Sequence, residues 1–163
     1  SAFLKDTTDV YNINFQTERS LRIKIEVDTN PPLSFATEQR LMVQPYSFMV
    51  QCMTLPCLFA GKMHALVYRQ WKNRVKGRDW YDFEWYVRWN HPLNWAHLHE
   101  RIVEFSGKEC TKAEFLELLQ YRLATTDINQ VKADVLPFVH HPQELDIWSN
   151  DYFLQLAQRI RWE

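Results

Sequence analysis

Two cations stand at helical spacing in the segment Phe-Ala-Gly-Lys-Met-His-Ala-Leu-Val-Tyr-Arg, residues 59–69. Lys62 and Arg69 are seven residues apart, so a helix would place them on the same side. The residues around Lys62 are small and leave room for another backbone or for a ligand. An ammonium group in such a place can hold a phosphate as a point charge. The pattern also fits an exposed basic face whose small residues serve helix packing, and both interpretations stay open.

A basic stretch runs from Arg69 to Arg78 and ends directly before two aspartates. It contains five basic residues and no acidic ones. Asp79 and Asp82 follow at i and i+3, near the predicted start of a helix, where negative charge complements the helix dipole. Capping and ion pairing would explain this pair, and so would a phosphate site with a base or a metal ligand beside it. Because the stretch includes Trp71, it also suits contact with nucleic acid.

Charged and apolar side chains alternate from Leu21 to Asp28. This period of two predicts a β-strand, which would place Lys24, Glu26 and Asp28 on one face. Two carboxylates about 7 Å apart on a strand can offer oxygen ligands to a hard cation such as Mg²⁺. A solvated strand face produces the same alternation, so the spacing leaves the metal site as one of two interpretations.

Composition excludes several other kinds of site. The chain has only 3 glycines, at Gly61, Gly77 and Gly107, so it can form neither a Walker phosphate loop nor a dinucleotide fingerprint. Its 3 cysteines form no CxxC pair, which is typical of reduced thiols in a cytoplasmic protein. The histidines show no zinc-site spacing. No apolar run approaches the roughly 18 residues needed to cross a bilayer, so we expect no membrane contact.

The order of the predicted elements indicates an α+β fold. Short strands are expected up to residue 53, including two near 41–43 and 48–50. Beyond it, apolar residues recur at three- and four-residue steps, which predicts five or six helices, the last reaching Arg161. We therefore expect a strand-rich part at 1–53 and a helical part at 54–163.

An aromatic group covers most of the helix expected near residues 79–89. Because aromatic helices that are apolar on several sides are usually buried, we interpret this group as core packing. Its members are Trp80, Phe83, Trp85, Tyr86 and Trp89.

Three segments, taken in order and spacing, resemble the AbiEii/AbiGii nucleotidyltransferase toxins. This family is the toxin half of type IV toxin–antitoxin and phage-defence (abortive infection) systems, within the DNA polymerase β-like nucleotidyltransferases. Its motifs include a strand that ends in an acidic residue, a Lys-x-x-Ala-x-x-x-Arg helix and an Arg-Asp-x-x-Asp segment that opens a helix. The resemblance covers about residues 20 to 90. The matching segments are Lys24-Ile-Glu-Val-Asp28 with Pro31-Pro32, Phe59 to Arg69, and Arg74-Val-Lys-Gly-Arg78-Asp79-Trp-Tyr-Asp82.

The resemblance implies a nucleotidyltransferase core, here a small antiparallel sheet portion followed by a C-terminal helical bundle. It implies that Lys62 holds the phosphates of a nucleoside triphosphate (NTP), while Arg69 and Arg78 add positive potential. Asp79 matches an active-site aspartate and Asp82 its companion on the helix face. Asp28 or Glu26 matches the acidic strand residue that completes a Mg²⁺-binding set. The implied partners are NTP, tRNA or another RNA, and an antitoxin protein, in the bacterial cytoplasm.

Two departures from the family pattern lead to a further expectation. A Gly-Ser followed by Asp-x-Asp should precede these segments and is not found, and Pro32 stands where a basic residue is expected. Because the chain opens with Ser-Ala, we expect it to be the C-terminal part of a longer toxin, inactive alone. The same departures suit an alternative function, a non-catalytic RNA- or protein-binding module derived from this fold.

Overall fold

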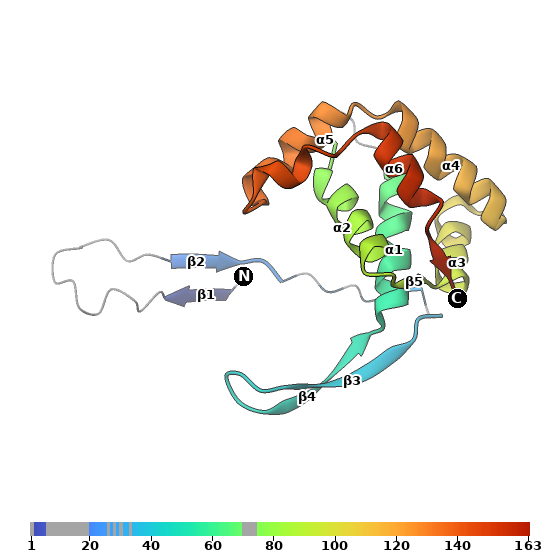
Figure 1. Cartoon of the computed structure of the whole chain (residues 1–163). Coiled ribbons are helices and arrows are strands. Elements are labelled where there is room, and N and C mark those ends of the chain that lie inside the picture. Colours follow the sequence, from blue (N-terminus) through green and yellow to red (C-terminus); the bar gives the residue numbers. More distant parts are fainter. Residues whose placement is uncertain are drawn as a thin grey trace. The chain divides into compact units, whose positions relative to one another are not determined.

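The computed structural model describes residues 2–5, 20–25, 27, 29, 31–32, 34–69 and 75–163 (Figure 1). Contacts within the chain divide it into two compact units, Ser1–Pro31 and Pro32–Glu163. Helices and antiparallel strand pairs confirm the α+β class. The division into a strand-rich part at 1–53 and a helical part at 54–163 remains a prediction.

The first unit contains a short antiparallel strand pair. Strand β1 (Ala2–Lys5) pairs with β2 (Ser20–Ile23), and the last pair of the ladder joins Ala2 to Ile23. The strand expected to continue to residue 28 ends earlier, because β2 ends at Ile23 and its pairing with β1 ends there too.

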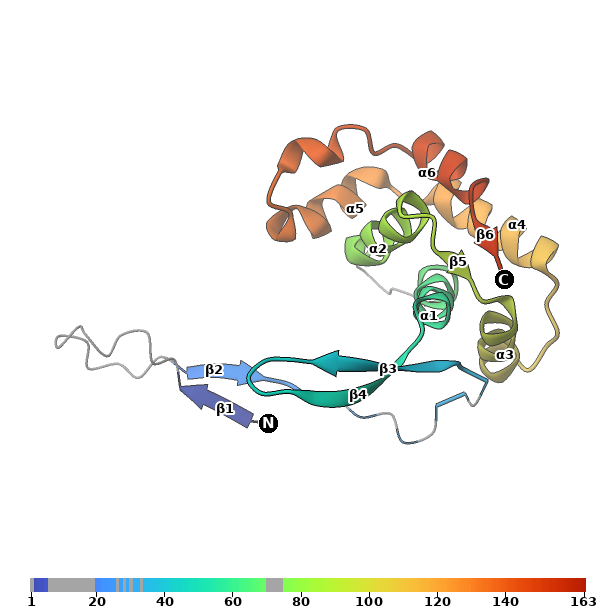
Figure 2. The same cartoon turned by 60° about the horizontal axis from the view of Figure 1, so that its bottom comes forward.

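A second hairpin leads directly into the first helix (Figure 2). Strands β3 (Thr37–Met42) and β4 (Phe48–Met53) pair antiparallel from Thr37↔Met53 to Met42↔Phe48. Both predicted strands are thus present, each longer than expected. Apolar side chains such as Leu41 and Met49 remain 60% and 57% exposed.

Six α-helices and two short 3₁₀ turns make up most of the second unit among the described residues. Their ends follow the local signals of the sequence: Thr111 and Glu114 form a reciprocal capping box, and Gly107 ends a helix with φ 68°. The elements are α1 (Leu55–Tyr68), α2 (Gly77–Arg88), α3 (Trp95–Ser106), α4 (Lys112–Thr125), α5 (Ile128–Val135), η1 (Leu136–Phe138), η2 (Pro142–Leu145) and α6 (Asn150–Ala157).

The last helix is shorter than its sequence suggests. We expected it to continue to Arg161, but α6 ends at Ala157, and β6 (Arg161–Trp162) pairs in parallel with β5 (Pro92–Leu93). The backbone amide of Glu163 donates to the carbonyl of Leu93 at 3.0 Å. Backbone pairing with a segment about 70 residues away thus replaces the last helical turn.

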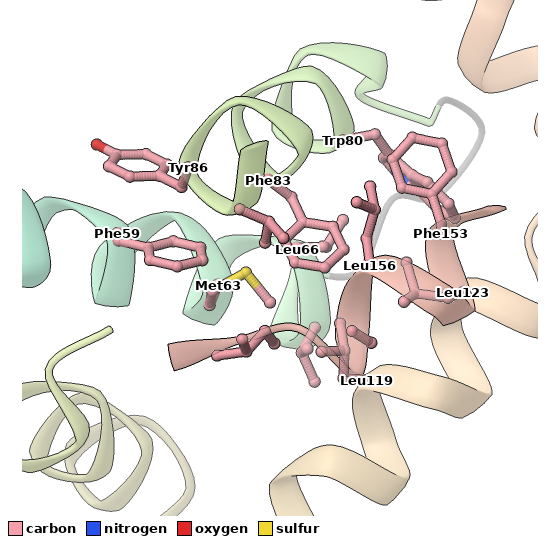
Figure 3. Packing of buried hydrophobic residues seen from close by; sticks show 14 of the residues in the cluster. Phe59, Met63, Leu66, Trp80, Phe83, Tyr86, Leu119, Leu123, Phe153 and Leu156 are labelled. Carbon is pink, nitrogen blue, oxygen red and sulfur yellow. The ribbon is translucent and has the colours of Figure 1, made fainter. Parts of the chain in front are cut away.

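One hydrophobic core joins α1, α2, α4 and α6 (Figure 3). The rings of Phe59 on α1 and Tyr86 on α2 stack with their centroids 4.5 Å apart, and Trp80 meets Phe153 of α6 edge-on at 4.8 Å. These aromatic contacts fix α2 against both neighbours. Among the described residues, no helix is both long and apolar enough to span a bilayer.

Candidate functional site

Helices α1 and α2 bring Lys62 and Asp82 together. The ammonium Nζ of Lys62 lies 2.6 Å from Oδ2 of Asp82, and the two side chains are 43% and 32% exposed. Lys62 lies in the third turn of α1 and Asp82 in the second turn of α2. Because α1 and α2 pack against each other, the two side chains meet at one edge of the helix pair. The partial exposure keeps this pair within reach of a solute.

Asp79 lies in the first turn of the same helix, but it is buried. Its side chain is 5% exposed, and Oδ2 lies 4.0 Å from Nη1 of Arg69, which is too long for a hydrogen bond. No described residue hydrogen-bonds that oxygen. Burial raises the pKa of the Asp79 carboxyl, and the cations of Arg69, Lys62 and Arg78 oppose this shift. A buried carboxylate with one oxygen that accepts no hydrogen bond is a candidate for proton transfer or for binding a cation.

The ion pairs show how these four charged side chains lie between α1 and α2, while the roles expected for them remain predictions. Lys62 and Arg69 both face carboxylates of α2, as their spacing of seven residues suggested, and Asp79 and Asp82 lie on the α1 side of α2. The small residues around Lys62 have mixed roles. Ala60 is fully buried, whereas a Cβ added at Gly61 would meet no atom within 4 Å.

Arg78 takes part in neither the Lys62–Asp82 nor the Arg69–Asp79 contact. It is exposed and lines a concavity of about 400 Å³ with Lys76, Asp134 and Phe138. Behind it, the Gly77 amide donates to Oδ2 of Asp134 at 2.9 Å, which holds the start of α2 against α5. Arg78 still contributes to the positive potential felt by Asp79.

Other predicted site residues lie outside the described residues. Glu26 and Asp28 are among them, as are residues 70–74 of the basic stretch, which include Trp71. Within the described part of the chain, no three His, Cys, Asp or Glu side chains form a group that could hold a metal ion. Asp79 and Asp82 alone therefore do not form such a group.

Two tryptophans assigned to the core are instead exposed. Trp80, Phe83 and Tyr86 are buried as expected, whereas Trp85 is 39% and Trp89 is 67% exposed. The prediction was wrong for these two because the helix is aromatic on more than one side, so periodicity could not show which side faces the core. Exposed large aromatics are candidates for contact with a partner.

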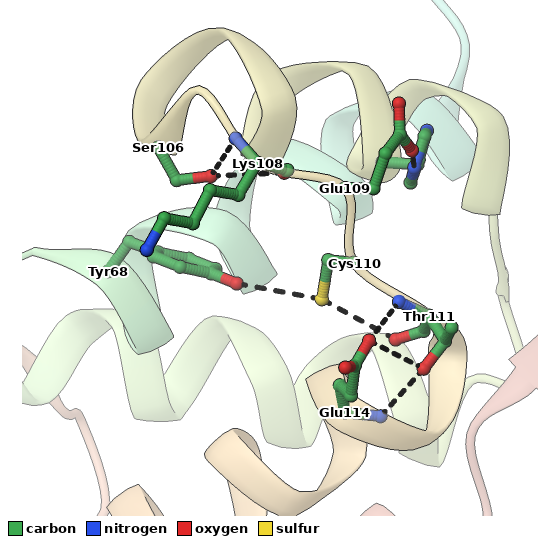
Figure 4. A network of polar contacts seen from close by, with 8 residues as sticks. Tyr68, Ser106, Lys108, Glu109, Cys110, Thr111 and Glu114 are labelled. Atoms are coloured by element: carbon green, nitrogen blue, oxygen red, sulfur yellow. Dashed lines mark hydrogen bonds and ion pairs between the residues drawn. The ribbon is translucent and has the colours of Figure 1, made fainter.

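A second polar network joins α1 to the connection between α3 and α4 (Figure 4). The Tyr68 hydroxyl lies 3.9 Å from Sγ of Cys110, and the thiol donates to the Thr111 carbonyl at 3.4 Å. Oε2 of Glu114 accepts hydrogen bonds from the amide and hydroxyl of Thr111 at 2.7 and 2.8 Å. These groups border a concavity of about 680 Å³, but their polar atoms are engaged with one another, so the network is best explained as structural.

Comparison with known proteins identifies one matching family. The family model described as "Nucleotidyl transferase AbiEii toxin, Type IV TA system" matches residues 5–156, which is most of the chain. No curated protein and no solved structure matches the chain. Because this match covers most of the chain, the chain belongs to the AbiEii nucleotidyl transferase toxins of type IV toxin–antitoxin systems.

Proposed function

We propose that this protein transfers a nucleotidyl group from an NTP to tRNA, and that Lys62, Asp79 and Asp82 carry the reaction. The observation that supports it most is the meeting of an ammonium, a guanidinium and two carboxylates between α1 and α2. Membership in a type IV toxin–antitoxin family implies a nucleotide substrate and an antitoxin protein. The tRNA acceptor rests on the family and on the basic stretch from Arg69 to Arg78.

In this proposal the cations hold the triphosphate. Lys62 exchanges its contact with Asp82 for the NTP phosphates, and Arg69 and Arg78 add positive potential. An ammonium at a surface ion pair can make this exchange, because such a pair contributes only about 0 to 1 kcal/mol. Positive charge around the phosphates stabilises the negative charge that builds up as pyrophosphate leaves.

In this proposal Asp79 is the general base. A hydroxyl oxygen of the acceptor attacks the α-phosphorus, the bond from that phosphorus to the bridging oxygen breaks, and pyrophosphate leaves. The hydroxyl proton passes to the Asp79 carboxylate, whose raised pKa makes it a better acceptor than an ordinary aspartate. Asp82 orients Lys62 until the nucleotide binds.

Nucleotidyltransferases of this kind generally use a divalent metal, and we propose Mg²⁺. The carboxylate of Asp28 or that of Glu26 is proposed to hold it, on the resemblance of the strand motif. When bound, such an ion screens the charge of the phosphates and orients them for in-line attack.

The test measures transfer of a nucleotide from labelled NTP to bacterial tRNA by the full-length protein. We expect Lys62→Ala and Asp79→Asn each to lower the rate at least about 100-fold. Asp79→Asn should leave the free energy of unfolding equal or raise it by up to about 1 kcal/mol, because it removes a buried charge. The matched controls are Lys108→Ala and Asp151→Asn, both at exposed positions of the second unit, and they should retain the full rate.

The outcomes separate this proposal from the alternative, a non-catalytic binding module. That alternative draws support from Lys62 and Arg69 already facing carboxylates within the chain. Full transfer by both site variants would contradict the proposed residues. A protein that binds tRNA but transfers no nucleotide under any supplied NTP and metal would favour the binding module.

A further inference from the structure

The exposed face of α2 gathers aromatic and basic side chains. The exposed residues of α2 and its C-cap fall at i, i+3, i+7, i+10 and i+11, which is one stripe along a helix. We call this stripe the aromatic–basic face. It consists of Arg78, Tyr81, Trp85, Arg88 and Trp89.

None of the three acidic residues of α2 is among the exposed residues of this face. Asp79 is buried and Asp82 pairs with Lys62 on the α1 side, while Glu84 is buried and accepts hydrogen bonds from α6 and the segment before it. Both arginines of the helix remain exposed, and Arg88 is 62% exposed with its Nη1 3.9 Å from Oε1 of Glu84. The charge that α2 presents on this face is therefore positive.

The aromatic rings on this face are partly ordered by neighbours. His91 stacks on Trp85 with centroids 5.0 Å apart and planes 30° apart, and Tyr81 lies 6.3 Å from Trp148. Trp89 is 67% exposed. Water disfavours so large an exposed apolar ring, and the core contacts of α2 are already made by Trp80, Phe83 and Tyr86.

We propose that the aromatic–basic face binds single-stranded RNA, with bases stacking on Trp85 and Trp89 and phosphates pairing with Arg78 and Arg88. Single-strand binding surfaces combine these two kinds of side chain, because every base has a face that can stack and every linkage carries a negative charge. Arg78 and Arg88 are ten residues apart, about 15 Å along the helix axis, which is the length of about four stacked nucleotides.

The position of the face links it to the candidate site. Asp82 lies four residues after Arg78 and three before Trp85, so it borders the face on the side of α1. A strand on the face would therefore pass beside the Lys62–Asp82 pair. That this strand is the nucleotide acceptor rests on the proposed function; that the face binds RNA does not.

The test titrates the full-length protein into a fluorescein-labelled single-stranded RNA of about ten nucleotides and follows anisotropy at several salt concentrations. We expect Trp85→Ala and Trp89→Ala each to weaken binding about tenfold, and Trp89→Phe to restore most of the loss. Arg78→Gln and Arg88→Gln should each lower the slope of log Kd against log salt by about 0.7. Tyr121→Ala is the matched control, since Tyr121 is 71% exposed on α4, and it should bind as the unaltered protein does.

Unchanged RNA affinity in both tryptophan variants would overturn the proposal. So would a loss of antitoxin binding without a loss of RNA binding, which would assign the face to a protein partner. A separate measurement, nucleotide transfer by Lys62→Ala, tests the proposed function. If Lys62→Ala keeps full transfer while the tryptophan variants lose RNA affinity, the catalytic assignment fails and the RNA face stands.

Discussion

At the scale of single residues, His64 lies among aromatic rings and cations. It stacks on Tyr68 with ring centroids 5.0 Å apart and meets the edge of Phe105 at 5.3 Å. Its Nε2 atom is buried and has no hydrogen-bond partner among the described residues. Burial, with the nearby cations of Arg101 and Arg69, lowers the pKa of His64 to about 4. The ring is therefore neutral in the folded protein at neutral pH.

This lowered pKa predicts a loss of stability in acid. The unfolded chain binds a proton at His64 below about pH 6.5, whereas the folded protein does so only near pH 4. The stabilisation is thus present above pH 6.5 and is lost as the pH falls toward 4. The full shift corresponds to about 3 kcal/mol, and partial contact of the ring with water reduces the expected effect to about 2 kcal/mol.

The measurement is urea unfolding of the unaltered protein and of His64→Phe at about pH 7 and about pH 4.5. The variant cannot take up the proton, so its loss of stability between the two pH values should be smaller by about 2 kcal/mol. His140→Gln, at an exposed position outside this cluster, serves as the control and should behave as the unaltered protein. An equal acid loss in His64→Phe would show that the ring is not the group that titrates.

At the scale of elements, α2 begins where it touches α5. A Cβ added to Gly77 would lie 2.3 Å from the carbonyl oxygen of Val131 and 3.1 Å from the amide nitrogen of Val135. Both are backbone atoms, so no side chain can move aside. Gly77→Ala should therefore lower the free energy of unfolding by about 3 kcal/mol, through a forced separation of the two helices.

Gly61 provides a matched substitution in α1. A Cβ there meets nothing within 4 Å, and the residue is inside the helix, so Gly61→Ala should raise the free energy of unfolding by about 0.5 to 1 kcal/mol. Chemical unfolding of both variants measures the two opposite signs. A gain in Gly77→Ala would contradict the packing of α2 on α5, and a loss in Gly61→Ala would contradict the open space beside Lys62.

Local sequence signals predicted where helices and strands lie better than they predicted which elements pack or pair with one another. The capping box of Thr111 with Glu114 and the left-handed Gly107 involve only neighbours in sequence, so signals of this kind can be recognised without the fold. The strand pairing of Arg161 with Pro92 joins residues far apart, and nothing near Arg161 announces it. The close packing of Gly77 could not be predicted from the sequence either, because its packing partner is on another helix.

In the candidate site, too, features within one helix could be predicted from the sequence, whereas contacts between helices could not. The shared side of Lys62 and Arg69 follows from helical spacing, but the pairing of Lys62 with Asp82 depends on how α1 crosses α2. Burial separates Asp79 from Asp82, and periodicity could not assign it because α2 is apolar on several sides. Trp85 and Trp89 were misassigned for the same reason.

At the scale of the whole second unit, α2 is held on one side by residues of the C-terminal segment. Glu84 is 6% exposed, and its Oε2 accepts from Nε1 of Trp148 at 2.9 Å. Its Oε1 accepts from the Tyr152 hydroxyl at 2.6 Å. Burial and this contact raise the pKa of Tyr152 to about 12, so the hydroxyl remains a donor at neutral pH. One carboxylate thus ties α2, which bears the site and the aromatic–basic face, to a segment about 65 residues later.

Replacing this carboxylate should loosen that connection. Glu84→Leu leaves the buried Trp148 donor and the half-buried Tyr152 hydroxyl without their acceptor, and we expect it to lower the free energy of unfolding by about 3 kcal/mol. Glu84→Gln keeps an acceptor but loses the charge, so about 1 to 2 kcal/mol is expected. Glu104→Leu, at an exposed position of α3, is the control and should change stability by less than about 0.5 kcal/mol.

Hydrogen exchange shows whether the loss is local or transmitted. If Glu84 joins α2 to the C-terminal segment, amides of α6 should exchange faster in Glu84→Gln, although the substitution is in α2. Faster exchange confined to α2, with α6 unchanged, would mean that the two hydrogen bonds do not couple these elements. In the coupled case the variant should also bind single-stranded RNA more weakly, because the aromatic–basic face is on the helix that Glu84 holds in place.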